Sequence, residues 1–163
     1  MSERKGEQSW TVPVPANVLA APGASLTALP GYHDVSVSLT RDGRELWFSS
    51  NRPGGLGGYD LWVSRMTENG QWGNPVNPGK PFNSEADEQW GISWSADGTK
   101  AVFASNRLFG TANNALSCRL FDYDSAQNPD QVNEILPEGY KSQNSPDQGL
   151  RWACLEPDGQ KIW

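Results

Sequence analysis

The sequence predicts an all-β protein that consists of repeated antiparallel sheets, and three observations support this fold class. The 17 glycines and 12 prolines of the 163-residue chain are typical of many short strands joined by turns. Apolar residues alternate with polar ones in several segments, which is the period of a β-strand. Three stretches of the chain also resemble one another, and they align on the pairs Asp42-Gly43, Asp97-Gly98 and Asp158-Gly159. An internal repeat of this kind indicates several copies of one sheet-forming unit.

The spacing of the repeat sets the size of that unit. The Asp-Gly pairs lie about 55 and about 61 residues apart, which suits one four-stranded blade of a β-propeller per unit. Closed propellers typically need four to eight blades, so the expected propeller is incomplete, with about two full blades plus parts of others. The expected divisions are an N-terminal segment with the outer strand of a preceding blade at 1–33, a first blade at 34–83, a second blade at 84–144 and the start of a third at 145–163.

An incomplete set of blades leaves three explanations open. The chain is a fragment of a larger propeller, or it assembles with other copies as a homo-oligomer that completes the propeller, or it forms an open stack of sheets. In the open stack, a strand predicted at Trp10–Val14 completes the last blade and protects an exposed sheet edge.

The strands of the first unit can be predicted in order. Val35, Val37 and Leu39 alternate with polar residues and predict the inner strand. Asp42-Gly43 supplies the positive-φ positions of a tight hairpin turn. The apolar run at 46–48 then predicts a return strand buried between neighbouring sheets. The further predicted strands are 59–63 and 71–76 in the first unit and 92–94, 101–103, 120–121 and 132–135 in the second, with one turn of helix within 126–136.

Residues 39–63 read Leu-Thr-Arg-Asp-Gly-Arg-Glu-Leu-Trp-Phe-Ser-Ser-Asn-Arg-Pro-Gly-Gly-Leu-Gly-Gly-Tyr-Asp-Leu-Trp-Val. This stretch resembles the WD40-like (PD40) repeat of bacterial β-propellers, the type found in the translocation protein TolB and beside OmpA-like peptidoglycan-binding domains. The second unit continues in parallel, with Ala-Ser-Asn-Arg at 104–107 matching Ser-Ser-Asn-Arg at 49–52. Residues 108–114, however, depart from the glycine-rich loop of the first unit. The resemblance therefore implies the fold more strongly than any function carried by that loop.

Charge and termini restrict the partners and the compartment. A net charge of −6 and a pI near 4.7 disfavour attraction to phosphate backbones, so we expect no nucleic-acid partner. No apolar run approaches the length of a membrane span, and the first residues lack the apolar core of a signal peptide. We expect the cytoplasm, or the periplasm or cell envelope if an export signal has been removed. Cys118 and Cys154 are compatible either with a disulfide or with free thiols.

Propeller geometry places the candidate ligand-binding residues on one face of the molecule. The loops that enter each inner strand and those that join the second strand to the third lie on this face, opposite the Asp-Gly hairpins. The mixed charges and glycine-rich loops of the face suit a protein or glycan partner. Its candidate residues are His33, Asp34, Asn51, Arg52, Tyr59, Glu88, Asn106 and Arg107.

Several of these candidates also have a structural interpretation. Arg52 and Arg107 could grip a carboxylate, but their repetition favours a structural ion pair or loop clamp. Neighbouring residues of a strand point to opposite faces, so Asp87 and Glu88 are expected to order a loop by accepting backbone amides rather than to share acid–base work or bind calcium. Residues 54–58 are expected to form a tight turn. The tryptophans are expected in the core, except that Trp10, Trp72 and Trp163 could stack on a sugar.

The motif inventory favours binding over catalysis. The chain has a single histidine, His33, and contains no Gly-x-Ser-x-Gly, Cys-x-x-Cys or His-Glu-x-x-His motif. We therefore predict no catalytic residue, metal site or cofactor, and a non-catalytic module that recognises a protein or glycan partner, similar to cell-envelope members of the family. Two alternatives remain: the propeller portion of a larger hydrolase or polysaccharide lyase whose catalytic residues lie outside this chain, and a unit that serves assembly alone.

Overall fold

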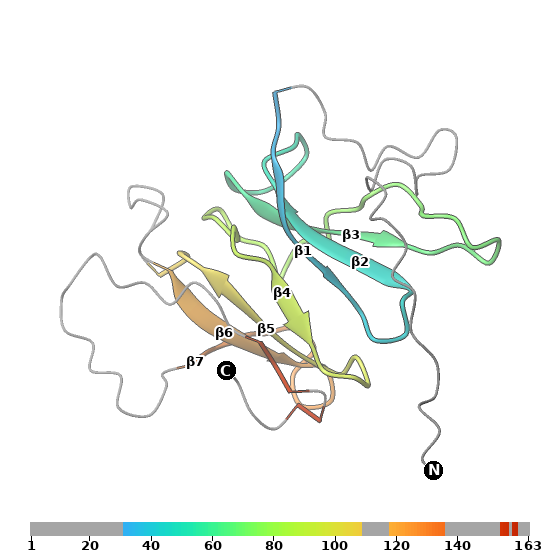
Figure 1. Ribbon diagram of the computed structural model, residues 1–163. Coiled ribbons are helices and arrows are strands. Elements are labelled where there is room, and N and C mark those ends of the chain that lie inside the picture. Colours follow the sequence, from blue (N-terminus) through green and yellow to red (C-terminus); the bar gives the residue numbers. More distant parts are fainter. Residues whose placement is uncertain (1–30, 109–117, 136–153, 157, 160–163) are drawn as a thin grey trace, which may run out of the picture.

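A computed structural model describes residues 31–108, 118–135, 154–156 and 158–159. Within these ranges the protein is all-β, without a helix, and its strands form two antiparallel sheets (Figure 1). The first sheet has the order β1-β2-β3 and the second β4-β5-β6-β7. The strands are β1 (Asp34–Leu39), β2 (Glu45–Ser50), β3 (Asp60–Arg65), β4 (Ile92–Trp94), β5 (Lys100–Ser105), β6 (Arg119–Asp124) and β7 (Asn133–Ile135).

The outer strand expected at 71–76 is reduced to two isolated bridges. Val76 pairs with Val63, and Trp72 pairs with Met66. Between them Pro75 has no amide hydrogen to donate, which interrupts the ladder. The first sheet therefore has three strands where four are expected. Trp72 is buried, so it is not available to stack on a sugar, and Trp10 and Trp163 lie outside the described residues.

The turn of helix expected within 126–136 is absent from its described part, residues 126–135. The carboxylate of Asp124 accepts hydrogen bonds from the amides of Ala126 and Gln127 at 2.9 and 3.1 Å. An Asp side chain that binds nearby amides in this way offers the backbone an alternative to helical bonds. The chain consequently turns after β6 and continues into β7.

The three Asp-Gly turns have one geometry. Gly43, Gly98 and Gly159 have φ of 71, 70 and 69°. Their amides donate to the carbonyl three residues earlier at 2.9, 3.0 and 2.8 Å. Only the glycine of each pair takes a positive φ among the described residues, whereas both central residues would do so in a type I′ turn. The predicted hairpin turns at Asp42 and Asp97 are thus confirmed, but the glycine alone, and not the aspartate, supplies a positive φ.

A β-bulge interrupts β1 and was not expected. The pairing of β1 with β2 shifts by one residue between Val35 and Ser38, and Ser36 takes a φ of 55°. A bulge adds one residue to one strand of a pair. The bulge therefore places two residues of β1, Ser36 and Val37, opposite one residue of β2, Phe48.

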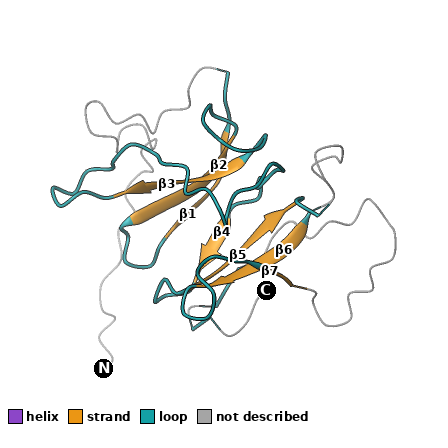
Figure 2. Ribbon diagram, turned by 180° about the vertical axis from the view of Figure 1, so that it is seen from behind, coloured by secondary structure: helices purple, strands orange, loops and turns teal. Residues whose placement is uncertain are grey.

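The two sheets pack face to face around an aromatic core, as seen from behind in Figure 2. Trp47, Leu61 and Val63 of the first sheet meet Phe103 and Phe121 of the second. The linker between the sheets adds Phe82, whose ring lies 5.4 Å from that of Trp47 and 4.7 Å from that of Tyr123. Burial of large aromatic rings supplies much of the stabilisation that the few aliphatic residues cannot.

The sheets stack head to tail. Trp47 of β2 faces the second sheet, and Phe103 of β5 lies in the same core cluster. The repeat counterpart of Phe103, however, is Phe48, which lies on the opposite side of β2 from Trp47. We call the side of each sheet that carries Phe48 or Phe103 its leading face and the side that carries Trp47 or Val102 its trailing face. The trailing face of the first sheet thus packs on the leading face of the second.

The start of the third repeat lies beside the second sheet. The amide of Leu155 donates to Ser93 Oγ of β4 at 3.1 Å, and a Cβ placed on Gly159 would lie 3.1 Å from the side chain of Lys100. The third repeat therefore begins against β4, as β4 itself lies beside β1 (Figure 1). The predicted segment 1–33, except for residues 31–33, and most of 145–163 lie outside the described residues.

Candidate functional site

The Ser-Asn-Arg sequence that begins at the last residue of β2 forms a compact clamp. Ser50 Oγ accepts hydrogen bonds from the amide and the Nε of Arg52 at 3.2 and 3.1 Å. The Nη2 of Arg52 then donates to both carboxylate oxygens of Asp34 at 2.9 and 2.8 Å. The side chain of Arg52 is almost wholly buried. A charge-assisted pair in this setting fixes the loop after β2 to the start of β1.

The same clamp recurs after β5. Ser105 Oγ accepts from the amide and the Nε of Arg107 at 3.1 and 3.0 Å, and the Nη2 of Arg107 lies 3.3 Å from Glu88 Oε1. Arg107 also donates to the carbonyl oxygens of Pro81 and Phe82 in the linker between the sheets. The second clamp therefore joins the loop after β5 to both the linker and the start of the second repeat.

The asparagine of each Ser-Asn-Arg motif accepts a hydrogen bond from the backbone amide of the residue that precedes the clamp carboxylate. Asn51 Oδ1 accepts from the amide of His33 at 2.7 Å, and Asn106 Oδ1 accepts from the amide of Asp87 at 2.6 Å. His33 therefore occupies the place of Asp87, and Asp34 the place of Glu88. His33 contributes through its backbone to this contact, and the residue is exposed.

Each arginine also lies over two aromatic rings of its leading face. The guanidinium carbon of Arg52 is 4.7 Å from the ring centre of Phe48 and 5.4 Å from that of Trp62. For Arg107 the distances are 5.2 Å to Phe103 and 4.7 Å to Phe121. Cation–π attraction at these distances adds to the ion pairs. The interpretation of both arginines as structural ion pairs is confirmed.

Burial dominates the electrostatics of the second clamp. Glu88 has no exposed surface, and this burial raises the pKa of its carboxyl, although hydrogen bonds from Ser105 and Ser84 and the charge of Arg107 act in the opposite direction. Burial likewise lowers the pKa of Arg107, against the attraction of Glu88. Two buried charges that satisfy each other form a structural pair whose disruption is costly.

The glycine-rich loop before β3 packs on the loop that precedes β4. Asp87 Oδ1 accepts from the amide of Tyr59 at 2.9 Å, and the amide of Glu88 donates to the Tyr59 carbonyl at 2.7 Å. A Cβ on Gly57 would overlap the carbonyl oxygen of Ala86. Glycine is thus needed here for close approach of two backbones.

Asp87 and Glu88 act as the sequence suggested. Asp87 accepts from the amide of Tyr59, and Glu88 Oε2 accepts from the amide of Ser84 at 3.1 Å. Both carboxylates therefore order loops through backbone amides. The structure brings the eight predicted residues into two groups, one at each clamp: His33, Asp34, Asn51 and Arg52, and Tyr59, Glu88, Asn106 and Arg107.

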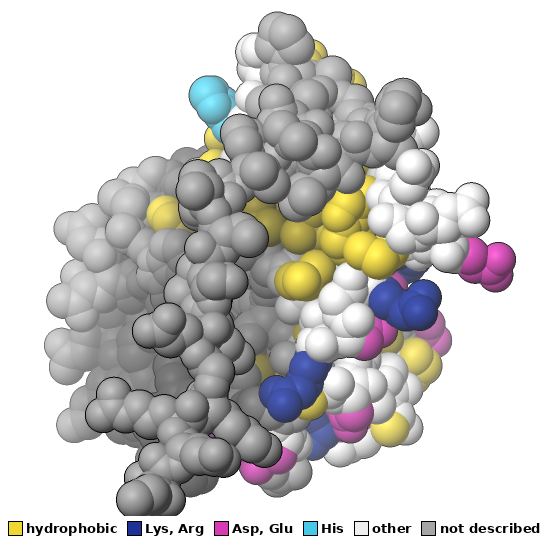
Figure 3. Space-filling view, turned by 45° about the vertical axis from the view of Figure 1, so that its right-hand side comes forward, with side chains coloured by type: hydrophobic (Ala, Val, Ile, Leu, Met, Phe, Trp, Pro, Cys, Tyr) yellow, Lys and Arg dark blue, Asp and Glu magenta, His cyan; other side chains and the backbone are white. Residues whose placement is uncertain are grey.

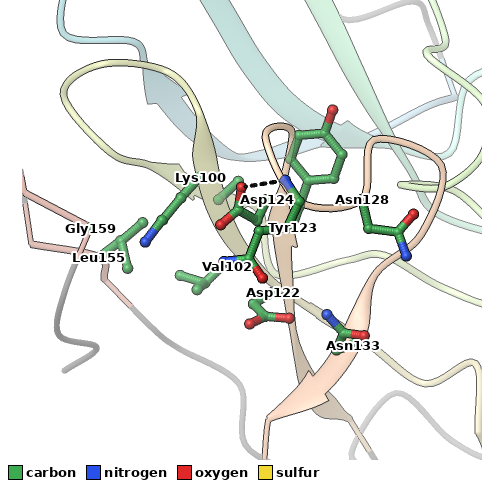
Figure 4. Close-up of a pocket in the computed structure, with 11 residues that line it drawn as sticks. Lys100, Val102, Asp122, Tyr123, Asp124, Asn128, Asn133, Leu155 and Gly159 are labelled. Carbon is green, nitrogen blue, oxygen red and sulfur yellow. Dashed lines mark hydrogen bonds between the residues drawn. The ribbon is translucent and has the colours of Figure 1, made fainter.

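In the described part of the chain, hollows also lie away from these clamps, and no sequence motif predicted them. A cavity of about 480 Å³ opens on the trailing face of the second sheet, where Lys100, Asp122 and Asp124 lie (Figure 4). A groove of about 550 Å³ separates the hairpins at Asp42 and Asp97. These hollows form where the side chains of neighbouring elements do not fill the space between them, a property that no local motif reveals.

A further hollow, of about 220 Å³, lies where three inner segments meet. It is lined among others by Ser38, Ser93 and Cys154, which occupy equivalent positions of the three repeats. Cys118 is buried and Cys154 is exposed, and the two do not form a disulfide.

The surface itself combines apolar and charged side chains. Figure 3 shows a face on which hydrophobic side chains gather beside lysine, arginine and acidic side chains. Val37 and Leu39 are 64% and 56% exposed. Leu39 is the repeat counterpart of Trp94, which packs against the first sheet. The exposed residues of β1 therefore lie where a preceding sheet would pack.

Among the described ranges, no group of three or more His, Cys, Asp or Glu side chains is arranged to hold a metal ion. In the same part of the chain, no helix has the length and apolar character needed to cross a membrane. A scan against protein-family models found no match for the chain, and a comparison with curated protein sequences found none either.

Proposed function

We propose that this chain is a non-catalytic binding module whose stacked sheets are blades of a β-propeller, and that it recognises a protein or glycan partner. The repeated clamps support the architecture. Each blade of a propeller repeats the contacts of the one before, and here two sheets share the hairpin, the Ser-Asn-Arg motif and the aromatic contacts of the arginine.

Head-to-tail stacking supports the same architecture. When each sheet packs its trailing face on the leading face of the next, each sheet is related to the one before it by the same rotation, about an axis near the inner strands. The inner segments of three repeats accordingly meet around one hollow, at Ser38, Ser93 and Cys154.

One observation carries the proposal of a non-catalytic role. The charged candidates on the loop-bearing face are engaged inside the protein: Arg52 binds Asp34, and Arg107 binds Glu88. A general acid, base or nucleophile must reach a substrate proton or carbonyl, and Glu88 has no exposed surface. These residues therefore serve the scaffold, and the partner binds to other surfaces of it.

Binding without turnover is the direct test. We expect the purified chain to bind members of an array of bacterial cell-wall glycans and glycopeptides, or of envelope-protein peptides, and to release them chemically unchanged, as checked by mass spectrometry. Turnover of a bound ligand that is lost in His33→Ala would overturn the non-catalytic role. Absence of saturable binding to every class on the array would overturn the binding role.

A further inference from the structure

The cavity on the trailing face of the second sheet has no counterpart on the first sheet. Trp47 pairs with Val63 in the first sheet, and at the same register Val102 pairs with Asp122 in the second. Val63 is buried in the aromatic core, whereas Asp122 lines a cavity of about 480 Å³. Where the first sheet has an apolar contact, the second sheet has a polar cavity.

Smaller side chains create this space. Val102 takes the place of Trp47, and Leu155 of the third repeat takes the place of Trp94. In the first interface the two tryptophan rings lie 5.2 Å apart and fill the gap between the sheets. Their replacement by aliphatic side chains leaves a volume within the range of small-molecule sites, roughly 300–1,000 Å³.

The polar side chains of the cavity are not all engaged with one another. Asp122 Oδ1 is buried and accepts no hydrogen bond within the described part of the chain. Asp124 is held by the amides of Ala126 and Gln127, and none of the ion pairs found in this part of the chain includes Lys100. A buried oxygen without a donor is unfavourable, so the scaffold leaves part of the hydrogen-bonding capacity of Asp122 unused beside the cavity.

The chemistry of the lining indicates a neutral ligand rich in hydroxyl groups. Asp122 and Asn133 offer acceptors and an amide donor, Lys100 offers a donor of opposite charge, and Val102 and Leu155 offer apolar contact (Figure 4). Carboxylate, amide and ammonium groups together match the alternating donors and acceptors of hydroxyls.

The geometry points to a sugar-binding site in this cavity, for a mono- or disaccharide unit held by Asp122, Lys100 and Asn133. This assignment rests on the proposed binding function and specifies the ligand class and the place. The cavity differs from the loop-bearing face, where the polar residues are already engaged.

Binding of defined neutral sugars tests the site. Glucose, galactose, N-acetylglucosamine and their β-linked disaccharides are titrated by calorimetry, with glucuronic acid and spermidine as charged probes. We expect saturable binding of at least one neutral sugar. Asp122→Val, which restores the residue of the first repeat, should weaken it at least tenfold, whereas Asp122→Asn retains an acceptor and should weaken it only a few-fold. Asp130→Asn, an exposed residue outside the cavity, should bind as the wild type does.

Urea unfolding separates loss of the site from loss of the fold. Because Asp122→Val removes a buried carboxylate oxygen without a donor, the variant should be no less stable than the wild type. Lys100→Met provides a second variant that should also weaken sugar binding while the chain stays folded. Sugar binding that is equal in Asp122→Val and wild type would overturn the site and leave the proposed function standing, as would binding of envelope peptides or charged probes alone. Absence of binding to every probe class would overturn both.

Discussion

The guanidinium of Arg107 lies 3.3 Å from the carboxylate of Glu88, which has no exposed surface. The same arginine contacts the linker carbonyls of Pro81 and Phe82 and two aromatic rings of β5 and β6. This one side chain therefore ties together the loop after β5, the linker and the leading face of the second sheet. Its removal affects all three at once.

Replacement of Arg107 by alanine should destabilise the protein strongly. The variant leaves the Glu88 charge buried without its partner, which typically costs about 3–5 kcal/mol. Urea unfolding followed by tryptophan fluorescence measures the loss. Arg65→Ala is the matched control, because the Arg65–Glu45 pair is largely exposed and such pairs contribute about 0–1 kcal/mol. Equal losses in the two variants would contradict the structural role of the clamp.

Glu88 should make stability decrease as the pH rises. Burial raises its pKa above the ordinary value of 4.5, so the folded protein binds this proton more readily than the unfolded chain. The favourable contribution is present at low pH and is lost as the pH rises through the folded-state pKa. The free energy of unfolding of Glu88→Gln minus that of the wild type should therefore increase from pH 4.5 upward and then become constant. Denaturant titrations at several pH values test this, and a decrease would refute it.

Asp97 should have the opposite pH dependence. Hydrogen bonds from the Ser95 hydroxyl and from the Thr99 amide and hydroxyl lower its pKa from 3.8 to about 2. Its contribution is therefore present above pH 3.8 and is lost as the pH falls towards 2. Asp97→Asn should be less stable than the wild type at neutral pH, and the difference should shrink between pH 3.8 and 2. Asp130→Asn controls for the loss of one negative charge, and a difference that stays constant over this range would exclude the effect.

Gly57 and Gly70 should tolerate alanine unequally. Gly70 has a φ of 74° and open space around its Cα, so Gly70→Ala should cost about 1–2 kcal/mol through backbone strain alone. A Cβ on Gly57 instead overlaps the Ala86 carbonyl. Because backbone at the loop before β4 must then move, Gly57→Ala should cost more than Gly70→Ala. Thermal unfolding of the two variants under one condition compares them, and the reverse order would contradict the predicted contact.

Most strands could be predicted because their signals are local. The apolar run at 46–48 lies within β2, the run at 101–103 lies within β5, and 92–94 coincides with β4. Alternation and turn residues specify such elements without knowledge of their neighbours. The outer strand at 71–76 failed because ladder formation also depends on the amide that Pro75 lacks.

The bulge at Ser36 was hidden for a different reason. It lies in a run in which serine and valine alternate, so one extra residue leaves the apparent period of two intact. Separately, an ungapped alignment on Asp-Gly pairs His33 with Glu88, whereas the structure pairs Asp34 with Glu88. Between this carboxylate and the Asp-Gly pair, the first repeat is thus one residue shorter than the second. The repetition of Arg52 and Arg107 predicted the clamps, but not which carboxylate each arginine binds.

The cavity beside Asp122 could not be predicted from any motif. Its recognition requires the register of β5 with β6, which shows that Asp122 replaces Val63. The segment between β5 and β6 is also longer than that between β2 and β3, so sequence spacing alone does not align these residues.

The head-to-tail arrangement of the sheets has an evolutionary consequence. A gene segment that encodes one such unit can be duplicated in tandem, because each copy carries both a surface that fits its predecessor and a surface that accepts its successor. The interface between each pair of copies can then diverge separately, since a substitution there needs a compensating substitution only in the adjoining unit. Each duplication in such a protein adds an interface that can acquire a new binding site, while the existing interfaces keep the array folded.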